Sequence, residues 1–111
     1  MESVGFETVL LRGIFYFLGN PEFDFKGPIR KGFRPITWID SVNKATSCSF
    51  VSDGEILEGD SKEVDVVVLN QLALGRKIEE GTILNIGSTK HKIGEFTVKR
   101  HLGLWDGGKV P

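Results

Sequence analysis

The sequence has very few of the residues that favour helices or that build redox and metal sites. Its 111 residues include two alanines, one methionine, one cysteine and two histidines. Alanine and methionine are among the strongest helix formers, so their scarcity excludes an all-helical protein. A single cysteine forms no internal disulfide and is typical of a reducing compartment.

The chain also lacks a long hydrophobic run and a net charge of either sign. The formal net charge is −1, so no overall field draws this protein to nucleic acid or to an anionic membrane. No stretch approaches the roughly 20 apolar residues of a membrane-spanning helix. Glu2 and Glu7 occupy positions at which a secretion signal carries basic residues. We therefore expect a cytoplasmic protein that does not enter a membrane.

Strand-forming residues are abundant instead. Valine, isoleucine and threonine together provide 25 β-branched residues, and 11 aromatic residues add to them. Fourteen glycines provide many turn positions, and the hydrophobic share of 40% is that of an ordinary globular protein. Since 111 residues are too few for two independent cores, the composition predicts one domain made almost entirely of β-strands.

Short apolar runs between glycine-rich turns predict the positions of these strands. The expected strands cover residues 8–18, 36–42, 46–51, 63–74, 82–86, 90–93 and 96–102, with a bulge or bend at Gly94. About six short strands with almost no helix favour a small closed antiparallel β-barrel, because closure leaves no open sheet edge. A barrel of this size is filled by its own side chains. We expect the barrel to span residues 1–102, followed by a tail at 103–111.

No group of residues in the sequence has the spacing of a catalytic or metal site. His91 and His101 are ten residues apart and lack the paired spacing of zinc ligands. Cys48 alternates with Thr46 and Phe50, which predicts a small buried filler and not a reactive thiol. The acidic residues stand beside glycine turns, where water solvates them. We therefore expect no enzyme activity, no metal and no cofactor, and a small enzyme acting in a surface groove is the least favoured of three hypotheses.

Charged residues are segregated along the chain. Residues 26–34 hold four cations and no acid, residues 53–65 hold six acids and one lysine, and residues 89–100 hold four cations and one acid. Lysine and arginine on a β surface neutralise phosphates, although exposed lysines also protect sheet edges from aggregation. The first hypothesis is that a basic face binds RNA or another polyanion. Its candidate residues are Lys26, Arg30, Lys31, Arg34, Lys90, His91, Lys92, Lys99 and Arg100.

The acidic stretch supports a different hypothesis, a protein-interaction module. Acidic side chains there would pair with a basic partner and speed encounter, and an exposed tryptophan would anchor the contact. Such a module could mimic a translation factor or neutralise a toxin. Its candidate residues are Asp53, Glu55, Glu58, Asp60, Trp38 and Trp105.

Three motifs in order along the chain resemble one known family. They are Lys-Gly-Phe-Arg-Pro at 31–35 with an aromatic residue at Trp38, Leu-Glu-Gly-Asp at 57–60, and Gly-Thr-Ile-Leu-Asn-Ile at 81–86 leading to Lys-Ile-Gly at 92–94. Together they resemble the C-terminal domain of elongation factor Tu over about residues 8–100.

The resemblance implies a fold and a kind of partner. In that family the domain is a small antiparallel β-barrel without catalytic activity, and it contacts the T-stem backbone of aminoacyl-tRNA. Lys26 and His91 each provide a basic residue at a place where the family has one, with Lys90 beside His91. Because the family domain contacts tRNA, the resemblance implies tRNA or other RNA as a partner. The nucleotide-binding domain of the factor has no counterpart in this sequence, so we expect no nucleotide cofactor.

Overall fold

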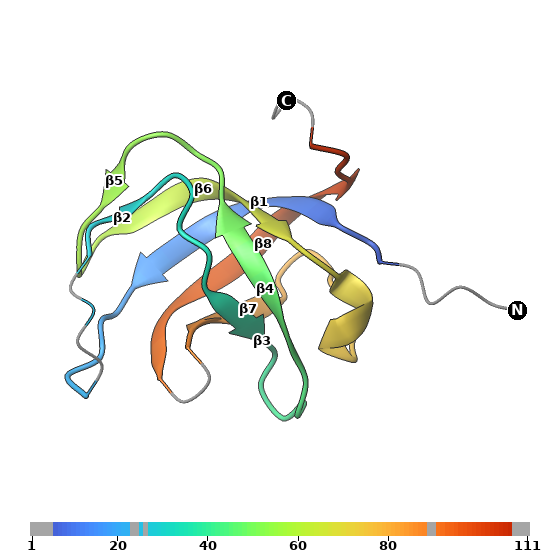
Figure 1. Cartoon of the computed structure of the whole chain (residues 1–111), viewed down its shortest axis with the longest axis horizontal. Coiled ribbons are helices and arrows are strands. Elements are labelled where there is room, and N and C mark those ends of the chain that lie inside the picture. Colours follow the sequence, from blue (N-terminus) through green and yellow to red (C-terminus); the bar gives the residue numbers. More distant parts are fainter. Residues whose placement is uncertain (1–5, 23–24, 26, 89–90, 108–111) are drawn as a thin grey trace, which may run out of the picture.

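A closed six-stranded barrel forms the body of the protein (Figure 1), which confirms the predicted fold class. The computed structural model describes residues 6–22, 25, 27–88 and 91–107. The barrel strands are β1 (Val9–Phe17), β3 (Ile36–Trp38), β4 (Ala45–Phe50), β6 (Ser61–Val68), β7 (Ile83–Gly87) and β8 (Lys92–Leu104). The strands β2 (Ile29–Arg30) and β5 (Glu55–Ile56) pair as a separate ribbon, and a short 3₁₀ helix, η1, spans Gln71–Leu74.

Every pairing in the barrel is antiparallel, and the strands follow the order β1-β6-β4-β3-β7-β8 before β8 meets β1 again. Strands β3, β4 and β6 are successive neighbours. The chain then passes through η1 and returns as β7 on the other side of β3, which is a Greek-key arrangement. Among the described residues, no helix is long and apolar enough to cross a bilayer.

Large apolar side chains fill the barrel. Alternate residues of β1 point inward, and Phe15 and Phe17 are fully buried. The Phe15 ring meets Phe50 edge to face, with ring centroids 4.9 Å apart. Cys48 on β4 is 2% exposed, which confirms its predicted role as a buried filler. Burial away from water raises the pKa of the Cys48 thiol to about 12.

Two glycines allow β1 and β8 to lie close together. A Cβ atom on Gly13 would stand 2.1 Å from the backbone oxygen of Thr97, and one on Gly94 would stand 2.4 Å from the backbone oxygen of Tyr16. The register of β8 against β7 shifts between Ile86 and Gly87, whose partners are Gly94 and Lys92. The expected bulge near Gly94 is therefore present, but β8 continues through it, and the two strands predicted at 90–93 and 96–102 are one.

Three expected strand ends are wrong. The strand predicted at 63–74 ends at Val68, because the Asn70 side chain accepts a hydrogen bond from the Leu72 amide and starts η1. The strand predicted at 36–42 ends at Trp38, since a turn follows it. At the other end, β8 continues to Leu104, two residues beyond the expected strand end at residue 102, because Leu104 pairs with Val9 in β1. The end of the expected tail, residues 108–111, lies outside the described residues.

Candidate nucleic-acid interface

An aromatic groove forms where two distant segments of the chain meet. In the β3–β7 pairing Ile36 lies opposite Gly87, so the loop before β3 reaches the turn between β7 and β8. The groove has a volume of about 260 Å³ and is lined by Phe25, Phe33, Arg34, Pro35, Ile36, Gly87, Ser88 and Ile93. The fold thus brings the first predicted basic block beside the hairpin that carries the second.

Stacked phenylalanine rings form one wall of this groove. Phe25 and Phe33 are parallel within 3°, with ring centroids 5.0 Å apart. Phe25 also stacks on Phe17 at 6.0 Å, and Phe33 contacts Phe50 at 5.7 Å. Both outer rings are half-buried and pack on the core. The wall is therefore a continuation of the barrel interior, and the core holds it in place.

Arg34 is the charged residue at the rim of the groove. Its side chain is exposed, whereas the following Pro35 is buried and restricts the Arg34 backbone to an extended conformation. The backbone on both sides is fixed as well, because the Phe50 amide donates to Phe33 O at 2.9 Å and the Cys48 amide donates to Pro35 O at 2.9 Å. Within the described ranges Arg34 forms no ion pair, so its charge is available to an anionic ligand.

Ser88, which follows β7, also lines the groove. The amide of Ser88 donates to His91 O at 3.0 Å, which closes the turn. His91 and Lys92 are both half-buried, and Lys92 pairs with Glu95 three residues later. The predicted residues Lys26 and Lys90 lie outside the described residues.

Two other cations of the first basic block, Arg30 and Lys31, pair with the predicted acidic stretch. Arg30 Nη2 lies 2.6 Å from Glu55 Oε2, and Lys31 Nζ lies 3.6 Å from Asp53 Oδ1. The β2–β5 pairing, in which Arg30 stands opposite Glu55, sets these contacts. The two blocks that are separate in sequence therefore face each other on the surface, and their charges partly cancel.

The remaining residues of the protein-interaction hypothesis lie on several different elements. Asp60 Oδ2 accepts a hydrogen bond from the Leu57 amide at 2.9 Å and stabilises the turn before β6. The Glu58 side chain lies against Gly19. Trp38 is half-buried on β3, whereas the half-buried Trp105 follows the end of β8, where its amide donates to Thr8 O.

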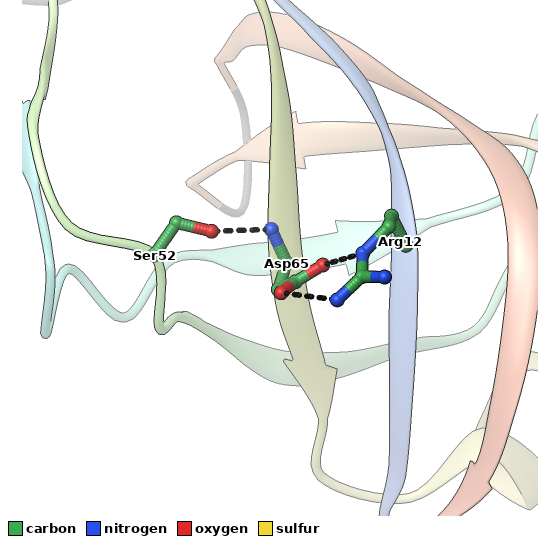
Figure 2. A network of polar contacts seen from close by, with 3 residues as sticks. All are labelled: Arg12, Ser52 and Asp65. Carbon is green, nitrogen blue, oxygen red and sulfur yellow. Dashed lines mark hydrogen bonds and ion pairs between the residues drawn. The ribbon is translucent and has the colours of Figure 1, made fainter. Parts of the chain in front are cut away.

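Lys99 and Arg100 are exposed on β8, far from the groove. Lys99 follows Lys92 by seven residues, roughly 23 Å along a strand. Arg100 stands opposite Arg12 of β1, and Arg12 binds Asp65 of β6 in a two-pronged ion pair (Figure 2). These two cations therefore belong to a separate part of the surface.

The Arg12–Asp65 pair is a polar contact that the sequence analysis did not predict. Arg12 Nε and Nη2 donate to the two Asp65 carboxylate oxygens at 2.8 and 3.1 Å, and the Asp65 amide donates to Ser52 Oγ at 2.6 Å. Hydrogen bonding to Asp65, and then attraction by its charge, raises the pKa of Arg12. Arg12 and Asp65 are register partners in β1 and β6, but they are 53 residues apart in sequence, and no local pattern indicates their pairing.

Comparison with known proteins does not assign this chain to a family. No protein-family model matches the chain, and no curated protein matches its sequence. The function is therefore inferred from the groove and its charges.

A wider cleft of about 750 Å³ lies toward the other end of β8. Its lining residues are Glu7, Gln71, Leu72, Gly75, Arg76, Lys77, Ile78, Glu79 and His101. The Gly103 amide donates to His101 Nδ1 at 3.1 Å, which places the proton of the neutral ring on Nε2. That nitrogen lies 2.9 Å from Gln71 Oε1, and Gln71 Nε2 donates to Glu7 Oε1 at 2.7 Å. These bonds join the segment before β1 to β8 through Gln71 of η1.

The cleft does not have the charge of a polyanion site. Arg76 and Lys77 line it together with Glu7 and Glu79, so charges of both signs line the cleft. No group of three or more potential metal ligands occurs among the residues described. The aromatic groove beside Arg34 is thus the best candidate for binding an anionic polymer.

Proposed function

We propose that this protein is a non-enzymatic module that binds RNA through the groove between Arg34 and the β7–β8 turn. One observation carries the proposal: an exposed arginine without an ion-pair partner in the described ranges stands at the rim of a groove lined by aromatic rings. Positive charge combined with aromatic faces is the usual composition of surfaces that bind single-stranded nucleic acid.

The backbone around Arg34 favours phosphate binding. A guanidinium group presents its donors in a planar fork that fits a phosphate. Because Pro35 and two backbone hydrogen bonds hold the segment extended, Arg34 loses little backbone freedom when it binds. Each phosphate that it neutralises releases counterions, so the binding should weaken as salt increases.

The proposed interface is smaller than the basic face expected from the sequence. Arg30 and Lys31 pair with Glu55 and Asp53, and Lys99 lies far along β8. Lys92 pairs with Glu95, and neither it nor His91 lines the groove, so the interface that we propose comprises Phe25, Phe33, Arg34 and Ser88.

The family resemblance is consistent with this proposal. A small antiparallel barrel is the fold that the resemblance implies, and the corresponding domain of elongation factor Tu contacts tRNA. Arg34 belongs to the segment 31–35 on which the resemblance depends. We therefore also propose that this chain is a relative of that domain.

Fluorescence anisotropy with labelled tRNA and a labelled single-stranded oligonucleotide tests the function. We expect the wild-type protein to bind at low salt and to lose affinity between about 50 and 200 mM salt. Arg34→Gln should weaken binding and reduce the slope of log K against log salt by about 0.7 for the single strand, the share of one phosphate contact.

The matched control is Arg76→Gln, which removes the same charge from the cleft at the other end of β8. It should leave both affinity and slope near the wild-type values. Absence of binding at low salt, binding that salt does not weaken, or equal losses in the two variants would each refute the proposed function.

A further inference from the structure

We infer that the groove beside Arg34 accepts one unpaired base, so that the protein prefers single-stranded RNA to duplex RNA. This inference rests on the proposed function and adds the class of RNA that the site recognises. It differs from what the family resemblance implies, which is contact with the backbone of a duplex stem.

The size of the groove fits a single planar ring. Its volume of about 260 Å³ is less than the roughly 300–1,000 Å³ of pockets that enclose a drug-sized molecule. A base within an A-form duplex is stacked on both faces and presents only its edges. An aromatic wall can therefore contact a base face only when that base has left the stack.

The lining of the groove fits a base better than it fits a phosphate. Phe25, Phe33, Pro35, Ile36 and Ile93 provide apolar surface, which a bare phosphate backbone would not use. The parallel rings of Phe25 and Phe33 continue inward to the core aromatics. A base bound here packs against the apolar surface that these side chains provide.

Two polar side chains are among the described residues that line the groove. They are the guanidinium group of Arg34 and the hydroxyl group of Ser88. With a base in the groove, we expect the guanidinium to contact a phosphate of the RNA and the hydroxyl to bond to a base edge or a 2′-hydroxyl. The groove thus offers apolar surface to the base, a cation to the phosphate and a hydroxyl group to the base edge or the sugar.

Changes to the RNA test the inference without altering the protein. The probes are a single-stranded oligonucleotide, the same strand with abasic nucleotides, and a duplex of equal length. Stacking of one base on aromatic side chains contributes roughly 5- to 150-fold in affinity. We expect the intact strand to bind more tightly than the abasic strand by a factor in this range, and more tightly than the duplex.

A protein variant then assigns the preference to the groove. Phe25→Leu keeps an apolar side chain but removes the ring, and it should abolish most of the difference between the intact and abasic strands. The control is Phe6→Leu, because Phe6 is an exposed aromatic next to Glu7 at the cleft, and it should preserve that difference. Circular dichroism and thermal unfolding measure whether both variants fold. If Phe25→Leu does not fold, the comparison of RNA probes on the wild-type protein decides whether the protein prefers an unpaired base.

The outcomes separate this inference from the proposed function. If the intact strand, abasic strand and duplex bind equally with normal salt dependence, the base-binding inference is wrong while RNA binding through charge stands. If the preference for the intact strand persists in folded Phe25→Leu, the base lies elsewhere and the inference is also wrong. If no probe binds at low salt, the proposed function fails and the inference fails with it.

Discussion

The buried thiol of Cys48 makes the stability of this protein depend on pH in the alkaline range. Burial raises the pKa of Cys48 from 9.0 to about 12 in the folded protein, whereas the unfolded chain exposes the thiol to water. Below pH 9 the thiol is neutral in both states, and its contribution to stability is fully present. As the pH rises from 9 to 12, only the unfolded chain ionises, so the folded state loses stability until the pH passes the folded pKa.

The size of this effect follows from the difference between the two pKa values. One pKa unit corresponds to about 1.36 kcal/mol, so a difference of about three units amounts to about 4 kcal/mol in total. Midway, at about pH 10.5, the loss is about 2 kcal/mol relative to neutral pH. At about pH 8 the loss is negligible, since few thiols of the unfolded chain are ionised there.

Urea unfolding of the wild-type protein and of Cys48→Ala measures this loss. Tyrosine and lysine residues titrate in the same range, but they are present in both proteins, so the difference between the two stability curves isolates Cys48. The alanine variant should be less stable at neutral pH, and its disadvantage should shrink by about 2 kcal/mol at about pH 10.5. A constant difference between the two proteins across this range would refute the reasoning, as would rapid labelling of the native thiol by a thiol reagent near pH 8.

Two further substitutions test the packing of the barrel and the cap of η1. Gly13→Ala places a Cβ atom 2.1 Å from the backbone oxygen of Thr97, and it should lower the free energy of unfolding by at least about 1–3 kcal/mol; an unchanged urea midpoint would contradict this close approach. Asn70→Ala removes the acceptor for the amides of Leu72 and Glu7 and should cost about 1 kcal/mol. Amide hydrogen exchange should become faster at these two positions, whereas Asn70→Asp, which keeps the acceptor, should preserve their protection.

The fold class could be predicted because most strands carry their own signal. The alternation through Phe15 and Phe17 and the valine run at 64–68 are strand patterns that need no knowledge of the partner strand. The end of β6 could not be predicted in this way. Residues 69–74 add four more apolar residues, but the pairing of β6 with β1 and β4 ends at Val68, and the Asn70 cap then starts a helix.

The candidate site was predictable in part. Arg34 and its aromatic neighbours could be identified from the basic block at 26–34. Sequence alone could not show that Arg30 stands opposite Glu55, because that contact depends on the β2–β5 pairing across 25 residues. The groove itself depends on the β3–β7 pairing, which the sequence does not show. The cleft residues Gln71, Arg76 and Lys77 form no local sequence pattern that indicates a binding site.

The adjacency of β1 and β8 has a consequence for the order in which the molecule is made. The two strands that pair with β1 come late in the chain, since β6 begins at Ser61 and β8 begins at Lys92. During synthesis, β1 and β7 therefore remain with one unpaired side until β8 leaves the ribosome. Exposed strand edges of this kind template aggregation, so ribosome-bound chains that stop before Lys92 should need protection by chaperones, and release of β8 should end that need at once.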